Sequence, residues 1–593
     1  MSPDDASPDS APEAAPPKEK RFLTDAMLLQ MTRMLAERRL VQRDRIDELQ
    51  ARRALTGEEL DALLVKEGLV AESDILACMA ELSRIPFQPV ADLPIAQEAV
   101  ARVPPRVALR YKVMPVSLRG DTVTLATSRV PTQGAVDGLR MALNAALDWV
   151  LCTDSDITRT IKHFYGLGAE TIDHIAPAAH APNLEIEGKD ISVENADEGV
   201  VKFVNQLISE AIRTEATDIH IEPFEDRLRV RYRIDGILQD IPVPAGVVHL
   251  RKAIASCIKI MAEMDIAERR KTHDGRIKVR SGKEEFDLRV SVLPTRFGET
   301  VNMRLLNRQT MFIDLEHLGL AKEQMVPVQY LASMPHGVVL LTGPTGSGKT
   351  TTLYALLDKI SSPEHKIITV EDPIEYQMNG ITQVQVHAQI GLTFASVLRS
   401  ILRHDPDIVL IGEIRDMETA DIAVRSSLTG HLVFSTLHTN DAPSAVTRLI
   451  DMGVEPFLIS SCLEGVIAQR LVRRVCPACR EPFAPDDIIH EEISGLFPDR
   501  IADAVFYRGR GCPDCNFSGY RSRIGLFEIM VMNDILRGMV VHQRPSTEIK
   551  YKAIEAGMIT LRQDGWLKTL NGHTSIDEVV RVTRKADFGV APA

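Results

Sequence analysis

One glycine-rich octapeptide constrains this sequence more than any other feature. Residues 343–350 read Gly-Pro-Thr-Gly-Ser-Gly-Lys-Thr, which matches the pattern G-x-x-x-x-G-K-[ST]. The octapeptide follows the apolar run Val338–Leu341 and precedes a stretch with helical periodicity. In such a strand–loop–helix context, backbone N–H groups wrap around phosphate oxygens at the positive end of a helix. The sequence therefore predicts a nucleotide-binding loop on a parallel α/β sheet.

The motif also assigns contacts to individual side chains. We expect Lys349 to reach the β- and γ-phosphates, and the Thr350 hydroxyl to ligate Mg²⁺. The predicted cofactors are therefore ATP and Mg²⁺. The residues expected to contact the nucleotide are Gly343, Pro344, Thr345, Gly346, Ser347, Gly348, Lys349, Thr350 and Thr351.

Two further apolar runs end in acids, as parallel strands do at a ligand crevice. The run at 408–411 is followed by Glu413, which could hold a water bound to Mg²⁺; a solvated acid in a turn is the alternative. The run at 368–370 leads into Glu371 and Glu375. We expect Glu371 to polarise the attacking water, with Glu375 as its rival.

A histidine follows one more apolar run. His438 comes directly after residues 432–437 and could sense the γ-phosphate, although a lone histidine at such a place is more often structural. The order and spacing of four motifs then resemble one family. They are the octapeptide at 343–350, Val-Glu-Asp-Pro-Ile-Glu at 370–375, Gly-Glu-Ile-Arg-Asp at 412–416, and Gly-His with Thr-Leu-His between 430 and 438.

These motifs resemble the GspE/PilB family of type II secretion and type IV pilus assembly ATPases, over about residues 196 to 585. The resemblance implies a RecA-like motor domain that works as a ring, a homo-hexamer, driven by ATP hydrolysis. It carries Lys349, Thr350, Glu371, Glu413 and His438 over as nucleotide-site residues. The partner it implies is an inner-membrane platform or adaptor protein of a secretion or pilus machine. The motifs do not separate the two kinds of machine.

The fold class expected from patterning and resemblance is multidomain α/β. A RecA-like P-loop motor domain is preceded by an α+β, PAS-like domain and by a mainly helical N-terminal module, and it carries a zinc-binding insert. The expected ranges are 1–25 disordered, 26–166 N-terminal docking module, 167–196 linker, 197–313 arginine-bearing α+β domain, 314–470 motor domain, 471–530 zinc insert and 531–593 C-terminal helical subdomain.

The α+β domain supplies positive charge from its alternating strands. Arginines that close over the γ-phosphate are expected, because phosphoryl transfer is catalysed mainly by positioning and charge neutralisation. The candidates are Arg231, Arg276 and Arg289, with Arg233 and Arg304 in the same set. In the strand at 217–223, Asp218, His220 and Glu222 share one face, and we favour a hydrogen-bonded structural cluster over a metal site.

Two Cys-x-x-Cys pairs predict a metal site. Four thiolates give the closed tetrahedral shell of structural zinc, so Zn²⁺ is the third predicted cofactor; a redox pair is the alternative. The resemblance supports zinc and favours the secretion and assembly branch over the retraction ATPases, which lack the insert. The predicted ligands are Cys476, Cys479, Cys512 and Cys515.

The N-terminal module resembles that of the same ATPases, some of which bind cyclic di-GMP through an Arg-Leu-Gly start and a terminal Gln. This chain has Glu59-Leu60-Asp61 and Leu82 at those places. An acid where a phosphate-binding arginine belongs should repel the ligand. The sequence therefore predicts no cyclic di-GMP binding, and docking to a membrane-embedded partner instead.

Charge and hydropathy narrow the remaining classes. The net charge of −13 argues against a broad nucleic-acid footprint, so we expect no nucleic-acid partner and rank a RecA-like nucleic-acid translocase second. A scaffold that binds nucleotide without turnover is disfavoured by the intact Lys349, Glu371 and Glu413. No apolar run approaches the roughly 18 to 20 residues that span a bilayer, and no secretory signal is visible. We expect a cytoplasmic protein, peripheral on the inner membrane through its partners.

Overall fold

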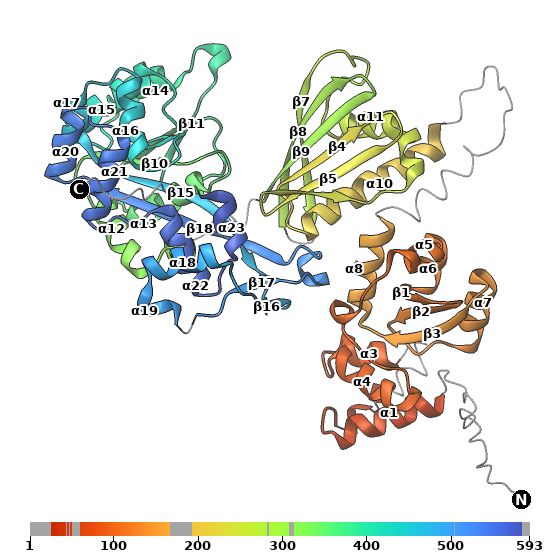
Figure 1. Cartoon of the computed structure of the whole chain (residues 1–593). Coiled ribbons are helices and arrows are strands. Elements are labelled where there is room, and N and C mark those ends of the chain that lie inside the picture. Colours follow the sequence, from red (N-terminus) through yellow and green to blue (C-terminus); the bar gives the residue numbers. More distant parts are fainter. Residues whose placement is uncertain are drawn as a thin grey trace, which may run out of the picture. The chain divides into compact units, whose positions relative to one another are not determined.

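The computed structural model describes residues 25–42, 44–46, 48–49, 60–166, 193–281, 284–307, 314–502 and 504–583 (Figure 1). The predicted disordered segment lies outside these residues except for its last position, and so does most of the predicted linker. Two compact units are formed, one within Met1–Gln206 and Ile241–Leu250, the other within Leu207–Asp240 and Arg251–Ala593. No helix among the described residues is long and apolar enough to cross a membrane.

The N-terminal part combines helices with a small sheet. Its sheet has the order β1-β2-β3, with β1 antiparallel and β3 parallel to β2. Leu63, Leu64 and Leu76 on the helices share one buried cluster with Val123 and Leu125 of β2, so the helices pack on the sheet. The elements are α1 (Asp25–Glu37), α3 (Leu60–Lys66), α4 (Glu72–Ser83), η1 (Val90–Asp92), α5 (Gln97–Arg102), α6 (Pro105–Tyr111), β1 (Val113–Arg119), β2 (Thr122–Thr127), α7 (Gln133–Leu143), β3 (Ala146–Leu151) and α8 (Asp154–Tyr165).

A six-stranded sheet follows, in the order β6-β5-β4-β9-β8-β7. Its strands alternate, so apolar residues such as Ile219 and Val230 are buried on one face. On that face the Tyr232 hydroxyl donates to the Leu207 carbonyl of α10 at 2.7 Å. The elements are α10 (Val193–Arg213), β4 (Asp218–Pro223), β5 (Leu228–Ile234), β6 (Ile237–Ile241), η3 (Ala245–Leu250), α11 (Arg251–Met261), β7 (His273–Ser281), β8 (Glu284–Thr295) and β9 (Gly298–Asn307).

A seven-stranded sheet with the order β12-β11-β13-β14-β10-β15-β18 forms the centre of the next region. Its strands run parallel except β18, which pairs antiparallel with β15. The elements are η4 (Leu315–His317), α12 (Lys322–Ala332), β10 (Gly337–Thr342), α13 (Lys349–Ile360), β11 (Ile367–Glu371), β12 (Thr382–Gln385), η5 (Ala388–Ile390), α14 (Phe394–Ile401), β13 (Ile408–Ile411), α15 (Met417–Leu428), β14 (Leu432–Leu437), α16 (Pro443–Asp451), α17 (Pro456–Cys462), β15 (Leu463–Val475) and β18 (Tyr520–Val531).

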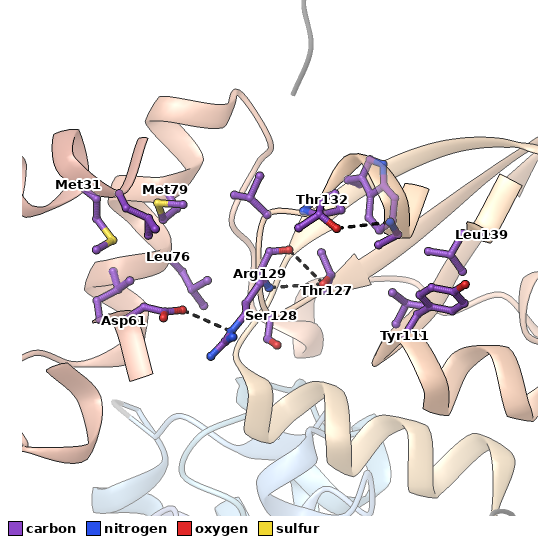
Figure 2. A pocket seen from close by; sticks show the side chains of 17 residues that line it. Met31, Asp61, Leu76, Met79, Tyr111, Thr127, Ser128, Arg129, Thr132 and Leu139 are labelled. Atoms are coloured by element: carbon purple, nitrogen blue, oxygen red, sulfur yellow. Dashed lines mark hydrogen bonds and ion pairs between the residues drawn. The ribbon is translucent and has the colours of Figure 1, made fainter. Parts of the chain in front are cut away.

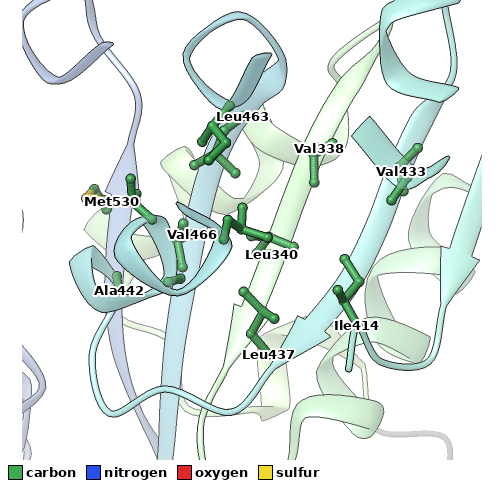
Figure 3. Close-up of a cluster of buried hydrophobic side chains, with 14 of the residues drawn as sticks. Val338, Leu340, Ile414, Val433, Leu437, Ala442, Leu463, Val466 and Met530 are labelled. Atoms are coloured by element: carbon green, nitrogen blue, oxygen red, sulfur yellow. The ribbon is translucent and has the colours of Figure 1, made fainter. Parts of the chain in front are cut away.

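Both faces of the seven-stranded sheet are buried. Val338 and Leu340 of β10 join a cluster with α14, α15 and α16, while Val339 and Leu341 join another with α12 and α13. Figure 3 shows the first cluster, in which Leu340 and Val466 come from neighbouring strands and are joined by Ala442. Two buried faces explain why these strands read as continuous apolar runs without alternation. A sheet that is buried on both faces can expose polar groups to a ligand where its strands end.

The cysteine-bearing segment leaves β15 and returns along β18, because these two strands pair over a long antiparallel ladder. It holds β16 (Arg480–Pro482), α18 (Asp487–Leu496), α19 (Pro498–Ile501), β17 (Tyr507–Gly509) and η6 (Pro513–Cys515). The chain then forms α20 (Asp534–Val541), α21 (Ser546–Glu555), α22 (Leu561–Leu570) and α23 (Ile576–Val582).

Candidate nucleotide and metal sites

The glycine-rich loop connects β10 to α13. Gly343, Gly346 and Gly348 all have positive φ, of 152°, 78° and 88°. A side chain at Gly343 would place its Cβ 2.5 Å from the Gln469 carbonyl oxygen, so this position accepts glycine alone. Pro344, Thr345, Gly346 and Thr350 are exposed. The loop thus turns tightly against β15 and presents its outer side to a ligand.

Two groups of the loop fit an anion. The Ser347 hydroxyl oxygen is buried and has no hydrogen-bond partner among the described residues. The Lys349 ammonium donates to the Gly343 and Pro344 carbonyls at 2.7 and 3.2 Å. Burial lowers the pKa of Lys349 to about 8; Glu413 acts to raise it and Arg470 to lower it further. A buried cation and an unused hydroxyl beside the N-terminus of α13 fit a phosphate group.

The strand order brings the predicted polar residues to one edge. Strands β11, β13, β14 and β10 are neighbours in that order, and their carboxyl ends lead to Glu371, Glu413, His438 and the glycine-rich loop. The His438 Nε2 lies 3.4 Å from a Glu413 carboxylate oxygen, and Arg415 binds the other oxygen. Glu413 is mostly buried, whereas the His438 side chain is 49% exposed. Parallel strands form a ligand crevice at such an edge.

Glu371 and Glu375 have very different surroundings. The Glu371 carboxylate is buried and accepts hydrogen bonds from Thr369 at 2.6 Å, Gln383 at 3.2 Å and the Tyr354 hydroxyl. Glu375 is 35% exposed, and one of its oxygens lies 3.3 Å from the Arg289 guanidinium. Glu371 is therefore fully engaged in structural bonds, and the accessible carboxylate is Glu375.

The candidate arginines form rows across the six-stranded sheet. Arg276 pairs with Arg289, Arg289 with Arg304, Arg304 with Asp218, and Asp218 with Arg233, so one row crosses five strands. Like charges directly opposite each other are destabilising unless an anion compensates them. In this row Asp218 lies 3.0 Å from Arg304 and 3.7 Å from Arg233. Arg276 and Arg289 lie at the opposite end of the row, where Asp218 is not a direct neighbour of either.

Arg231 lies in the adjacent row of the same face, opposite His220. Its guanidinium donates to Glu222 at 2.8 Å. On β4 and β5, three buried polar atoms have no hydrogen-bond partner among the described residues: Nε2 of His220, Oε2 of Glu222 and Nε of Arg231. Among the described residues, the ligand atoms of Asp218, His220 and Glu222 do not come together as a cluster that could hold a metal. The two acids of this face, Asp218 and Glu222, are therefore held by ion pairs with arginines.

The four cysteines come together as one buried cluster, with all ligating sulfurs within 4.8 Å of one another. Sulfur–sulfur distances of 3.9 Å (Cys476 to Cys512), 3.8 Å (Cys479 to Cys515) and 3.7 Å (Cys512 to Cys515) are recorded. A tetrahedron with Zn–S bonds of about 2.3 Å has edges of about 3.8 Å. Backbone N–H groups also donate to two of the sulfurs, as they do to thiolates. The donor set fits a four-coordinate metal.

Residues 193–581 match the family described as type II/IV secretion system protein. This chain belongs to that family. It is 40% identical over 561 residues to the type IV pilus assembly ATPase PilB of Myxococcus xanthus, covering 94% of this chain and 99% of PilB. It is 42% identical over 562 residues to the type II secretion system protein E of Xanthomonas campestris pv. campestris, covering 93% and 98%. The predicted family, fold class and functional class, a secretion or pilus ATPase, are confirmed.

The prediction that the chain does not bind cyclic di-GMP is wrong. Residues 83–171 match the MshEN domain. A solved structure of MshE with cdg covers 23% of this chain and 98% of its own length at 20% identity, with a TM-score of 0.22. The positions on which the prediction depended, 59–61 and 82, all precede the matched range. Glu59 lies outside the described residues.

The electrostatic part of that prediction also missed a cation. The Asp61 carboxylate lies 3.4 Å from the Arg129 guanidinium, so its charge is partly compensated (Figure 2). Both side chains line a cavity of about 250 Å³, whose wall is largely apolar and includes Met31, Leu76 and Trp149. Arg129 is far from Asp61 in sequence, and only the fold brings the two together.

Sequence reasoning missed several residues that hold the site. Tyr354 and Gln383 fix Glu371, and Arg415 pairs with Glu413. Arg470 is buried behind the glycine-rich loop and donates to the Asn440 carbonyl at 2.8 Å. Gln469 and Arg470 interrupt an apolar run of β15 between Val466 and Val472, and a charged residue at such a place was the signal that could have revealed Arg470.

Proposed function

We propose that this chain is the Mg²⁺-dependent ATPase that powers type II protein secretion or type IV pilus assembly. The observation that carries the proposal is the meeting of the glycine-rich loop, Glu413 and His438 at the carboxyl edge of the seven-stranded sheet. Family membership over residues 193–581 and the names of both full-length relatives point to the same activity.

In this proposal the loop residues 343–351 hold ATP. The Lys349 ammonium exchanges its bonds to the Gly343 and Pro344 carbonyls for phosphate oxygens, and Ser347 gains a partner. The Thr350 hydroxyl and Glu413 would hold Mg²⁺, which would supply neutralisation of charge on the β- and γ-phosphates. His438 contacts the γ-phosphate side while it remains bonded to Glu413.

We assign activation of the attacking water to Glu375 and a supporting role to Glu371. Glu375 is accessible, and one of its oxygens faces Arg289; the other has no recorded partner among the described residues and can accept a proton. Glu371 uses its three hydrogen bonds to fix the beginning of the 372–378 segment that carries Glu375. The order of preference between the two carboxylates is thus the reverse of the one predicted from sequence.

The arginines complete the charge neutralisation. Arg276 and Arg289 lie directly opposite each other on neighbouring strands, so their positive charges repel. Arg231 lies in the next row. An anion with several negative oxygens relieves that repulsion, so a γ-phosphate brought against this face would bind it. Hydrolysis separates the γ-phosphate from ADP as inorganic phosphate, and release of that anion weakens the attraction, which would let the arginine-bearing domain move during each turnover. Such movement is the proposed source of mechanical work.

The chain would act as a homo-hexameric ring on the cytoplasmic side of the inner membrane, held there by a platform or adaptor protein. The family resemblance supports the ring and the peripheral location. The cysteine cluster would bind one structural Zn²⁺, because four sulfurs leave no open position for chemistry. Purified protein should therefore contain one equivalent of zinc, and Cys512→Ser should lose it; a zinc-free, correctly folded wild type would contradict this.

The test of the ATPase proposal is Lys349→Ala beside Lys359→Ala. Both lysines lie on α13, but Lys359 is exposed near the far end of the helix. We expect Lys349→Ala to lose at least about 10³-fold in kcat with an unchanged unfolding temperature, and Lys359→Ala to behave as wild type. Equal turnover by all three proteins would refute the proposal.

We also propose that the region matching the MshEN domain binds cyclic di-GMP. The family match over residues 83–171 supports this. Arg129 is a candidate cation for a phosphate, and Arg119, an exposed residue of β1, provides a matched control. Calorimetry with cyclic di-GMP should show micromolar or tighter binding by wild type and Arg119→Ala and weaker binding by Arg129→Ala. No heat of binding to the wild type would refute it.

A further inference from the structure

The first half of the loop that carries His438 is hydrogen-bonded to the strand end that leads into the glycine-rich loop. This loop, residues 438–442, connects β14 to α16. The Thr439 N–H donates to the Thr342 hydroxyl at 2.9 Å, and the two hydroxyls lie 2.6 Å apart. Thr342 is the last residue of β10, directly before Gly343. A shift of Thr439 would therefore disturb both His438 and the root of the phosphate-binding loop.

Its second half is held by residues that come much later in the chain. The Asp441 carboxylate accepts from the Lys550 ammonium of α21 at 3.0 Å. The Ala442 N–H donates to the Glu528 carboxylate of β18 at 2.8 Å. Lys550 also lies 3.8 Å from Glu528, so one ammonium serves two carboxylates. We call Glu528 and Lys550 the loop clamp.

The loop clamp lies in a largely buried environment. Glu528 is 1% exposed, and its second oxygen accepts from the Leu561 N–H at the start of α22 at 3.3 Å. Burial raises the pKa of Glu528, and Lys550 acts against that rise. The two acids in turn raise the pKa of Lys550, although burial opposes them. Removing the lysine would leave carboxylates next to each other without a cation, which is strongly unfavourable in a buried site.

The clamp touches none of the residues assigned to phosphate or water. It contacts the loop at the Asp441 side chain and the Ala442 N–H, which lie at the opposite end of this five-residue loop from His438. Asn440, between the two halves, is held through its carbonyl by Arg470 at 2.8 Å. Every residue of 439–442 thus has its own anchor, and the clamp is the part contributed by β18 and α21.

We propose that Lys550 is a positioning residue for ATP hydrolysis. Together with Glu528 it holds residues 438–442 in place. His438 thereby keeps its contact with Glu413, and Thr439 keeps its hydrogen bond to Thr342. The inference rests on the proposed ATPase function and adds to it a dependence of the nucleotide site on the C-terminal helices. It implies that disturbance of α21 by a partner or by a neighbouring subunit changes turnover without contact to the nucleotide.

The test compares Lys550→Met with Lys552→Met and Lys550→Arg. Lys552 lies on the same helix, with its side chain 48% exposed, and pairs only with Glu555 among the described residues. We expect Lys550→Met to lower kcat at least tenfold while the Kd for a fluorescent ATP analogue stays within twofold, and Lys550→Arg to recover to within threefold of wild type. Lys552→Met should match wild type. A kcat for folded Lys550→Met within twofold of wild type would refute the proposal.

A second readout does not depend on turnover. Amide hydrogen exchange in full-length Lys550→Met should be at least tenfold faster than wild type in peptides that cover 439–442, and unchanged in peptides from α13. If wild type lacks ATPase activity, the proposed function fails, and faster exchange in 439–442 still supports the positioning role. Unchanged exchange there would refute it. Should Lys550→Met fail to fold, Asp441→Asn serves the same two measurements, because it removes the ion pair and keeps an oxygen for Ser444.

Discussion

In the seven-stranded sheet the functional polar residues follow the ends of strands, whereas in the six-stranded sheet they occupy a whole face. The first sheet is covered by helices on both sides, so Glu413 and His438 can appear only where β13 and β14 stop. The second is apolar on one face, and its other face carries Arg276, Arg289 and Arg231 in cross-strand rows. The first arrangement fixes a small site rigidly; the second offers a broad cationic surface.

This difference has a mechanical meaning. A site at the ends of buried strands is preorganised, because each group is held by a core that cannot shift without loss of packing. A charged face on a separate sheet can approach or leave an anion as a body. The contact between Glu375 and Arg289 joins the two arrangements, since one partner comes from each sheet region.

The sharpest test of this comparison is to neutralise each of the two candidate acids in turn. Glu375→Gln should lower kcat by about 10²- to 10⁴-fold with an unchanged unfolding temperature, because it removes the accessible base. Glu371→Gln should lower kcat less than tenfold but also lower the unfolding temperature, because it weakens a buried network. Steady-state ATPase and thermal melts of both variants decide the matter. A larger kcat loss in Glu371→Gln would restore the order predicted from sequence.

Substitutions on the arginine face, the polar face of the six-stranded sheet with Arg231, Arg276 and Arg289, should have an intermediate effect on kcat. We expect Arg289→Ala to lower kcat by about 10- to 100-fold, since one of several cations on the γ-phosphate is lost. The control is Arg280→Ala, which should have no effect. Arg280 lies near the C-terminal end of the neighbouring strand β7, and its side chain is 73% exposed. The double variant of Arg276 and Arg289 should cost less than the product of the single losses, because the residues act as a unit. Wild-type kcat in that double variant would remove the arginine face from the mechanism.

The smallest effect concerns pH. Burial lowers the pKa of Lys349 to about 8 in the nucleotide-free site, and only its charged form attracts phosphate. Affinity for ATP should be constant below about pH 7, be about twofold weaker at pH 8, and be about tenfold weaker in all at pH 9. Titration of a fluorescent ATP analogue between pH 6.5 and 9.5 measures this. An affinity that stays level up to pH 9.5 would mean that Lys349 keeps its ordinary pKa.

The sequence predicted what is local in the chain. The glycine-rich loop, Glu413, His438 and the four cysteines each belong to a short motif whose context sets its geometry, and the fold places them as expected from strand order. The roles of Glu371 and Glu375 could not be separated in this way. What distinguishes them is hydrogen bonding to Tyr354 and Gln383, residues on other elements that no spacing rule connects to an acid.

Register explains the other gaps. Alternation places Arg276, Arg289 and Arg304 on strand faces, but only the pairing of β7, β8 and β9 makes them direct neighbours. The error about cyclic di-GMP concerns residues that are distant in the sequence and belong to no common sheet. Asp61 was judged as an isolated acid in a linear motif, whereas folding brings Arg129 beside it from a different element.

The most direct test of the account is the Mg²⁺-dependent ATPase activity of the purified chain beside its Glu413→Ala and Glu418→Ala variants, with light scattering on the same samples. Glu418 is a nearby exposed acid paired with Arg399, so it controls for the loss of one charge. The account predicts turnover in wild type and Glu418→Ala, loss of at least about 10²-fold in Glu413→Ala, and a hexamer-sized species in all three. Turnover that survives Glu413→Ala, or a wild-type hexamer without activity, would contradict it.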